Sequence, residues 1–239
     1  MRTRVLRRVV GCALLVAALA AAVADVRVFA RRGACAESYR TPGQGPDVAE
    51  REEFLKWYAS QIRLNVPVVR GKAKVLIVEF RDFQCATCRL ADEMLRPLLA
   101  QFGASHPGQV ALVAKHFPLD PLCNPAAATG RHVSACESAA AFEMARKEGA
   151  GTAMENFLYG HLEELTPTMV RIGVRQVLGI ADFDQRYKDV IGNVERDIAL
   201  GRSLEVNAVP TLFVNGVRIR GGMPRELLRA VIDLELARR

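Results

Sequence analysis

Two cysteines, Cys85 and Cys88, are separated by only two residues and follow an apolar run, "VLIVEF", at 75–80. The residues from 85 to 102 then have a helical pattern. A helix that begins at Cys85 has free N–H groups and a partial positive charge at its first turn, and both stabilise a thiolate there. Cys88 lies one turn further along the same face. This spacing predicts a pair of thiols that exchanges disulfides, in which Cys85 reacts first and Cys88 resolves the mixed disulfide.

Two other interpretations of the pair stay open. A Cys-x-x-Cys motif is also found in zinc sites, and Cys123 with Cys136 would complete four ligands. Neither of those cysteines belongs to a second Cys-x-x-Cys, and the four histidines lack paired ligand spacing, so we expect no metal. The pair could also be a surface disulfide without turnover, but so short a ring constrains almost nothing. The sequence therefore favours disulfide exchange.

The apolar patterns predict one mixed sheet with helices on both faces. The expected strands are 64–69, 75–80 and 110–117, followed by a hairpin at 211–219 around Asn215-Gly216. The expected helices are 47–62, 85–102, 132–148, 152–165, 167–178, 182–204 and 224–236. Thr166 and Asp182 are expected to cap the helices that follow them.

The N-terminal segment differs from the rest of the chain. Four arginines precede an uncharged run at 9–24, which ends in a small-x-small pattern and is shorter than the ~20 apolar residues of a comfortable membrane span. We expect residues 1–24 to be a cleaved export signal or, alternatively, an uncleaved membrane anchor. Residues 25–46 are predicted to be a tether, and 47–239 one domain with a helical insertion at about 125–204. Export would place the domain in an oxidising periplasmic or extracytoplasmic compartment.

The charge distribution argues against a nucleic-acid partner. The chain of 239 residues has a net charge of +7, but the first 24 residues hold four arginines and no acids, so the remainder carries only +3. No basic stripe with interleaved aromatic residues follows. We therefore expect no nucleic acid among the partners.

The order of these motifs resembles the thioredoxin fold: a strand, Cys-x-x-Cys at a helix start, a helical insertion, and Val209-Pro210-Thr211 before a hairpin. The insertion makes the chain similar to the DsbA-like family of exported thiol-disulfide oxidoreductases. The segments "EFRDFQCATC", "KHFPLDPLCN" and "HVSACESAAA" are most similar to DsbA-like domains associated with vitamin K epoxide reductase-type membrane proteins. The resemblance extends from about residue 64 to the C-terminus, and it implies an α/β thioredoxin fold with a mixed central sheet flanked by helices.

The resemblance assigns roles to residues around the pair. It implies that Cys85 is the exposed nucleophile and Cys88 the buried resolving thiol. Pro210 matches the cis-proline that faces the disulfide in this fold. The backbone of Val209 would then point at the pair, so that a peptide substrate pairs with it edge-on, beside Thr211.

An acidic residue beneath the pair is a further expectation. Glu79 matches the buried acid of the family, where burial would raise its pKa and let it accept or relay the proton of Cys88. Lys115, on the neighbouring strand, is a candidate counter-charge. The dipeptide between the cysteines departs from the family, since it lacks proline and histidine. Thr87 is a candidate to donate its hydroxyl to a thiolate instead, and the departure leaves the direction of electron flow open.

Four cysteines lie outside the Cys85–Cys88 motif. The resemblance implies a structural disulfide between Cys123 and Cys136, with a relay pair that passes electrons to a partner as the alternative. Cys12 lies in the export segment, and Cys35 in the tether is unassigned. The implied function is an exported oxidase of cysteine-containing proteins, without a cofactor, reoxidised by a quinone-linked membrane protein of the vitamin K epoxide reductase type. The alternatives are a reductase or isomerase, and a non-catalytic zinc-binding module.

Overall fold

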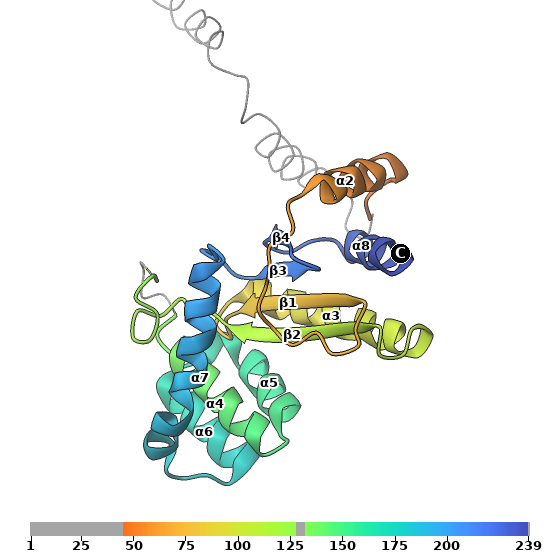
Figure 1. Ribbon diagram of the computed structural model, residues 1–239. Coiled ribbons are helices and arrows are strands. Elements are labelled where there is room, and N and C mark those ends of the chain that lie inside the picture. Colours follow the sequence, from red (N-terminus) through yellow and green to blue (C-terminus); the bar gives the residue numbers. More distant parts are fainter. Residues whose placement is uncertain (1–44, 128–131, 239) are drawn as a thin grey trace, which may run out of the picture. The chain divides into compact units, whose positions relative to one another are not determined.

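A mixed sheet forms the centre of the computed structural model, which describes residues 45–127 and 132–238 (Figure 1). The strands are β1 (Val75–Arg81), β2 (Val110–His116), β3 (Thr211–Val214) and β4 (Val217–Arg220). Their order is β2-β1-β3-β4; β1 and β2 are parallel, and the other neighbours are antiparallel. This mixed sheet with flanking helices confirms the predicted fold class.

Alternation along β1 gives the sheet two different faces. Leu76, Val78 and Phe80 pack into one apolar cluster with residues of α7 (Phe183–Ser203). This helix comes close to the sheet at Gly201, where an added Cβ would lie 2.6 Å from the Phe117 ring. Three more helices complete the thioredoxin-like part: α2 (Val48–Ser60), α3 (Ala86–Ser105) and α8 (Arg225–Ala237). Of these, α3 contacts β2, α8 contacts β1, and α2 contacts α8.

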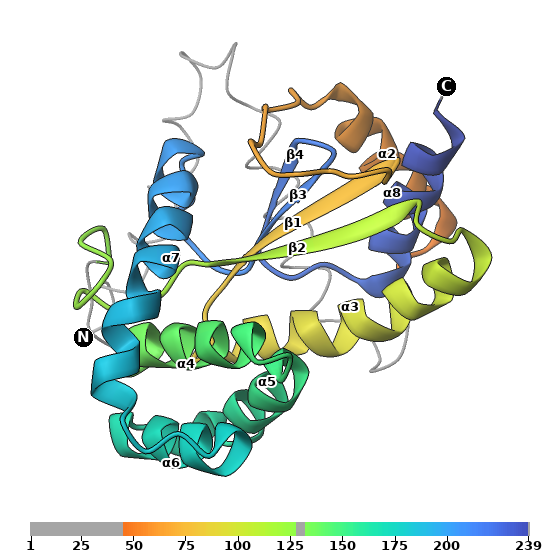
Figure 2. The same cartoon turned by 60° about the horizontal axis from the view of Figure 1, so that its bottom comes forward.

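The insertion between β2 and β3 is mainly helical from Ala135 onwards. It contains α4 (Ala135–Lys147), α5 (Gly151–Gly160), a 3-10 turn (Leu162–Glu164), α6 (Pro167–Leu178) and α7. These helices gather at one end of the sheet in both views (Figure 2). Their shared core includes Ala140, Met154, Leu158, Val170 and Phe183, together with Phe83 from the turn after β1. The insertion therefore packs directly against the segment that leads to Cys85.

The predicted strand at 64–69 is wrong, since the structure assigns no strand to this described segment. Its recorded backbone bonds are a single link from the Leu64 N–H to the Gly216 carbonyl and a local bond from Val68 to Val66. Pro67 has no N–H to donate, so a ladder along β3 and β4 cannot continue through it.

The two predicted helix caps differ. The Thr166 hydroxyl accepts a hydrogen bond from the Met169 N–H at 3.2 Å, which confirms the cap of α6. Asp182 occupies the N-cap position of α7, but within the described residues its side chain makes no capping bond. The carboxylate of Asp182 instead lies 3.7 Å from the Arg186 guanidinium, one helical turn away.

The predicted export segment at 1–24 and nearly all of the tether, with Cys12 and Cys35, lie outside the described residues. The residues from Pro46 onwards form one compact unit. Within the described ranges, none of the helices has the length and apolar character needed to cross a membrane.

Candidate functional site

Cys85 is the N-cap residue of α3. The Cys88 N–H donates to the Cys85 sulfur at 3.3 Å and to the Cys85 carbonyl at 3.0 Å. Cys85 is less exposed than the resemblance implied, because the chain around the helix start encloses it: 7% of its surface is accessible. Cys88 is fully buried, at 0%. The limited opening at Cys85 makes it the sulfur of the pair that a substrate can reach.

The two sulfurs have opposite acidities. The pKa of Cys85 is lowered to about 6, first by its hydrogen bond with Cys88 and then by the Thr87 hydroxyl, while burial opposes the shift. The Thr87 oxygen lies 3.4 Å from the Cys85 sulfur, as predicted for a donor in a dipeptide without histidine. Burial raises the pKa of Cys88 far above its usual value. At neutral pH the site therefore holds a thiolate at Cys85 and a thiol at Cys88.

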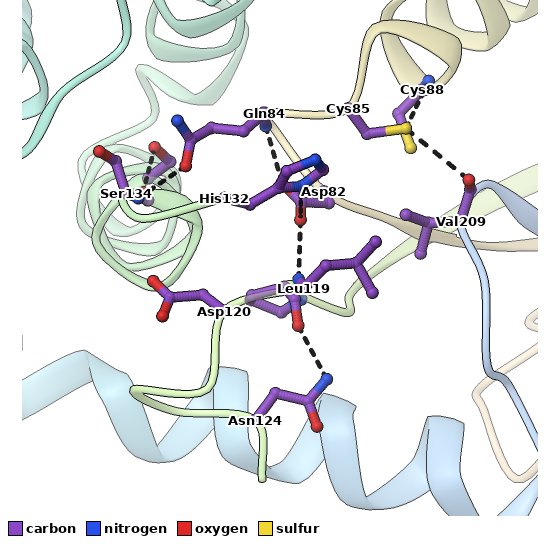
Figure 3. Close-up of polar contacts among 12 residues, drawn as sticks. Asp82, Gln84, Cys85, Cys88, Leu119, Asp120, Asn124, His132, Ser134 and Val209 are labelled. Atoms are coloured by element: carbon purple, nitrogen blue, oxygen red, sulfur yellow. Dashed lines mark hydrogen bonds and ion pairs between the residues drawn. The ribbon is translucent and has the colours of Figure 1, made fainter. Parts of the chain in front are cut away.

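The segment before β3 faces this sulfur from the other side of the site (Figure 3). The Val209–Pro210 bond is cis, and the Val209 carbonyl oxygen lies 3.7 Å from the Cys85 sulfur. The Pro210 carbonyl accepts a bond from the Gly221 N–H at 2.8 Å. Thr211 is buried, and its hydroxyl donates to the Ala208 carbonyl at 2.7 Å. The structure therefore brings Val209 and Pro210 to the site, whereas the Thr211 side chain holds the turn and is closed to a substrate.

Glu79 is buried in the middle of the sheet, with 1% of its surface exposed. Neither of its carboxylate oxygens has a hydrogen-bond partner within the described structure. Burial raises the pKa of Glu79 to about 7, and the nearby Arg81 charge opposes this shift. The residue is therefore a buried acid that can change its protonation state near neutral pH.

The predicted counter-charge, Lys115, is wrong. In the parallel register Glu79 pairs with Ala114, and Lys115 pairs with Phe80. Adjacent residues of a strand point to opposite faces, so Lys115 lies on the other side of the sheet from Glu79. There it forms an ion pair with Asp197 of α7 at 2.7 Å.

The charge near Glu79 belongs instead to a buried network that the sequence did not reveal. Arg81, 3% exposed, pairs with Glu155 of α5 and lies 3.9 Å from Asp92 of α3. Arg96 joins the same two acids, at 2.6 Å from each. These side chains come from a strand and two helices far apart in sequence, so no local spacing signals the network. It links the thioredoxin-like part to the insertion beneath the cysteine pair.

A second unpredicted cluster lies beside Cys85 (Figure 3). The buried Asp82 carboxylate accepts bonds from the Gln84 N–H at 2.7 Å, the Leu119 N–H at 2.8 Å and His132 Nδ1 at 2.7 Å. His132 lies before α4, which begins at Ala135, so it makes this contact from the preceding loop. A signal was available in Asp82, an acid three residues before the reactive cysteine.

Cys123 and Cys136 form a disulfide with a Cα–Cα distance of 5.9 Å. This bond is incompatible with the four-thiolate zinc site considered for the sequence, because it uses two of the four thiols. Of the cysteines that the structure describes, only Cys85 and Cys88 are free. Within residues 45–127 and 132–238, no three or more His, Cys, Asp or Glu side chains are grouped so that they could hold a metal ion.

Comparisons with known proteins agree with this geometry. The thioredoxin family model matches residues 67–234. The Na(+)/H(+) antiporter NhaA 1 of Mycolicibacterium vanbaalenii is 32% identical over 178 residues, which are 72% of this chain and 26% of the antiporter. The chain thus spans about a quarter of the length of this curated relative.

Solved structures share the fold at lower identity. The catalytic domain of Proteus mirabilis ScsC has a TM-score of 0.52 at 19% identity, covering 70% of this chain and 86% of that one. A thioredoxin-like oxidoreductase from Silicibacter pomeroyi has a TM-score of 0.52 at 22% identity, covering 72% and 92%. The fold is therefore that of the DsbA- and ScsC-type proteins, and because the family model matches well over half of the sequence, the chain belongs to the thioredoxin family.

Proposed function

We propose that this chain is an exported thiol-disulfide oxidoreductase that oxidises cysteine-containing proteins through Cys85 and Cys88. The observation that carries the proposal is the state of Cys85, a helix-capping sulfur whose pKa is lowered to about 6. The resolving thiol of Cys88 is buried one turn away. A stable thiolate beside a buried thiol is the arrangement that disulfide exchange requires.

The exchange begins with the oxidised pair. A substrate thiolate attacks the Cys85 sulfur, a substrate–Cys85 bond forms, and the Cys85–Cys88 bond breaks. Its electron pair stays on the Cys88 sulfur, which takes up a proton. A second substrate thiolate then attacks the substrate sulfur of the mixed disulfide and releases Cys85 as a thiolate. The substrate loses two electrons and the cysteine pair gains them.

Glu79 is the proposed proton donor to Cys88. The Cys88 thiolate is strongly disfavoured by burial, so it needs a proton as it forms. The raised pKa of Glu79, about 7, keeps part of this buried acid protonated near neutral pH. The charge of Cys85 adds a smaller upward shift to the pKa of Glu79.

Val209 supplies the proposed substrate contact. Its carbonyl oxygen faces Cys85, so a peptide strand that pairs there would bring its own sulfur to the reactive one. Backbone pairing of this kind depends little on the substrate side chains. The proposal therefore predicts broad specificity for unfolded or extended cysteine-containing segments.

Trapping of mixed disulfides tests the proposal. Cys88→Ser should accumulate covalent adducts with client proteins through Cys85, because the resolving thiol is missing. The matched control, Cys85→Ser with Cys88→Ser, should accumulate none through this site. If the single variant forms no more adducts than the control in cells, the proposed activity is wrong.

The direction of electron flow has its own test. A stabilised Cys85 thiolate favours the reduced pair and therefore an oxidising enzyme. The reduction potential, measured against glutathione, should be well above the −270 mV typical of thioredoxin. A value near about −270 mV would instead support the reductase or isomerase alternative.

We further propose that a quinone-linked membrane protein of the vitamin K epoxide reductase type reoxidises the pair outside the cytoplasm. This partner is supported by the similarity of the segments around both cysteine pairs to DsbA-like domains associated with such membrane proteins. A second candidate partner is an ion transporter, since the matched relative is a Na(+)/H(+) antiporter about four times longer than the shared region. Identification of the membrane proteins trapped by Cys88→Ser separates the two candidates.

A further inference from the structure

The connection between β2 and α4 is bonded to the turn that carries the reactive cysteine. The Leu119 N–H donates to the Asp82 carboxylate at 2.8 Å, and the Ser134 N–H donates to Gln84 Oε1 at 2.6 Å. Asp82 and Gln84 lie three residues and one residue before Cys85. Both ends of the connection therefore contact the active-site turn. The connection thus forms one wall of the site.

The Cys123–Cys136 disulfide closes the same connection. Asp120 binds both ends of the closed loop: its carboxylate accepts from the Leu122 N–H at 2.9 Å and from the Cys136 N–H at 3.4 Å. The Asn124 side chain donates to the Pro118 carbonyl at 2.8 Å. His132 lies inside this closed loop, four residues before Cys136. On its C-terminal side, the bond from the Ser134 N–H to Gln84 and the disulfide at Cys136 hold the backbone that carries it.

The His132 imidazole is held over the active-site turn (Figure 3). Its Nδ1 donates to Asp82 Oδ2 at 2.7 Å, and the Asp82 side chain has no exposed surface. The His132 side chain is 21% exposed, so it lies at the mouth of the site and can exchange protons with solvent. Asp82 also accepts the Gln84 N–H, which fixes the carboxylate and hence the ring.

Three acidic groups face this ring. The hydrogen bond to Asp82 raises the pKa of His132 most, and the charges of Asp82, Cys85 and Asp120 add to the effect, while burial opposes it. The interaction with Cys85 is reciprocal: a Cys85 thiolate stabilises the imidazolium, and the imidazolium stabilises the thiolate. Asp82 acts in the opposite direction on Cys85, because its own charge raises the Cys85 pKa.

We propose that His132 is a positioning residue that supplies a positive charge to the Cys85 thiolate, and that the Cys123–Cys136 disulfide holds it there. The two residues between the cysteines, Ala86 and Thr87, carry no charge of their own. The charge of His132 also offsets the buried negative charge of Asp82. This role rests on the proposed function for its purpose, but the acidity of Cys85 can be measured without a substrate.

The structural disulfide then sets the reactivity of the catalytic pair. With Cys123–Cys136 intact, His132 stabilises the thiolate and so favours the reduced catalytic pair. If Cys123–Cys136 is reduced, the loop loses its covalent closure and His132 its fixed place. Cys85 then becomes less acidic, and the enzyme a weaker oxidant.

The primary test is His132→Gln in the purified full-length protein. The rate of Cys85 alkylation is followed against pH by mass spectrometry, which separates Cys85 from the other cysteines. The variant should lower the thiolate-to-thiol ratio of Cys85 about three- to tenfold. His132→Lys, which keeps a positive charge, should retain most of the wild-type acidity, and His106→Gln, at the distal end of α3, should change nothing. An unchanged Cys85 pH profile in His132→Gln would overturn the proposal.

A double-mutant cycle tests the link to the disulfide. Cys123→Ser with Cys136→Ser should raise the Cys85 pKa in the same direction as His132→Gln, and adding His132→Gln to that pair should have little further effect. If the serine pair does not fold, Asp82→Asn takes its place, since it removes the anchor of His132 and should likewise shrink the effect of His132→Gln. Additive effects in the cycle would show that the disulfide does not act through His132.

The role of His132 and the proposed function can be rejected independently of each other. Failure of trapping by Cys88→Ser would reject the enzymatic activity, whatever the pH profile of Cys85. Failure of His132→Gln to change that profile would reject only the role of His132.

Discussion

The two cysteine pairs of this chain lie in neighbouring parts of the fold but have opposite properties. Cys85 and Cys88 sit on one turn at the start of α3 and are free. Cys123 and Cys136 are 13 positions apart, join a loop to a helix, and are bonded. A bond within one helical turn restricts the chain very little, whereas a bond across a loop of this length restricts the unfolded chain considerably.

The difference lies in the surroundings of the sulfurs. The Cys88 side chain lowers the pKa of Cys85 most, and the Thr87 hydroxyl and the Cys88 N–H lower it further. Cys136 is fully buried in the helical insertion, away from attacking thiols. The local electrostatics of a helix start therefore makes one pair suitable for exchange, and burial with loop closure makes the other suitable for stabilisation.

The largest expected effect comes from exchanging cysteines for serine in each pair. Cys85→Ser should abolish disulfide exchange with a reduced peptide. At about pH 5, where the Cys85 thiol of the folded protein is protonated, it should leave the free energy of unfolding nearly unchanged. Cys123→Ser with Cys136→Ser should keep measurable exchange but lower the free energy of unfolding by about 3 kcal/mol. Peptide oxidation assays and denaturant unfolding measure the two quantities. Loss of stability in the first variant and none in the second would contradict the assignment of exchange to one pair and stabilisation to the other.

The buried acid gives a smaller effect that depends on pH. The pKa of Glu79 is about 7 in the folded protein and about 4.5 in the unfolded one, so the folded state binds more protons between these values. The contribution of Glu79 to stability is therefore fully present below about pH 4.5 and is lost as pH rises through about 7. The contribution lost is about 3 kcal/mol, from the free-energy equivalent of each pKa unit.

Glu79→Gln should remove this decline. Denaturant unfolding of the oxidised protein, in which Cys85 and Cys88 do not titrate, should become flatter with pH across the neutral range. Glu163→Gln, an exposed acid of the insertion, is the matched control and should keep the wild-type profile. A Glu79→Gln protein with the same slope as the control would mean that Glu79 is charged in the folded state.

The smallest expected effect concerns the Thr87 hydroxyl. Thr87→Val removes the contact at 3.4 Å and should lower the thiolate-to-thiol ratio of Cys85 about two- to fivefold. Thr87→Ser keeps the hydroxyl and should behave as the wild type. Alkylation kinetics of Cys85 separate the three proteins. Equal kinetics in the valine and serine variants would show that the Thr87 hydroxyl does not contribute to the acidity of Cys85.

Local patterns made most of the fold predictable. The strand before Cys85, the helix after it and the Asn215-Gly216 hairpin were visible because their apolar periods and turn residues are contiguous in the sequence. The predicted strand at 64–69 failed because its apolar residues pack without a neighbouring ladder, and Pro67 interrupts it. Periodicity reports which residues are buried, but not whether a partner strand is present.

The parts of the site formed by neighbouring residues were predictable from the sequence, and the contacts between distant segments were not. Cys85 and Cys88 lie within one turn, so their spacing suggested disulfide exchange. The role of Thr87 was suggested by the difference between its dipeptide and that of the similar family. Lys115 was assigned to Glu79 although the register places them on opposite faces. His132 reaches Asp82 across 50 positions. Such contacts have no local signature.

The acidity of Cys85 tests the central claim most directly. Alkylation of Cys85 in the reduced full-length protein, followed against pH at this residue alone, should give a pKa of about 6. A thiolate would then predominate at neutral pH, as disulfide exchange at the start of α3 requires. A pKa near the 9.0 of an ordinary thiol would contradict the account, because Cys85 would then lack the stabilised thiolate on which the proposed exchange depends.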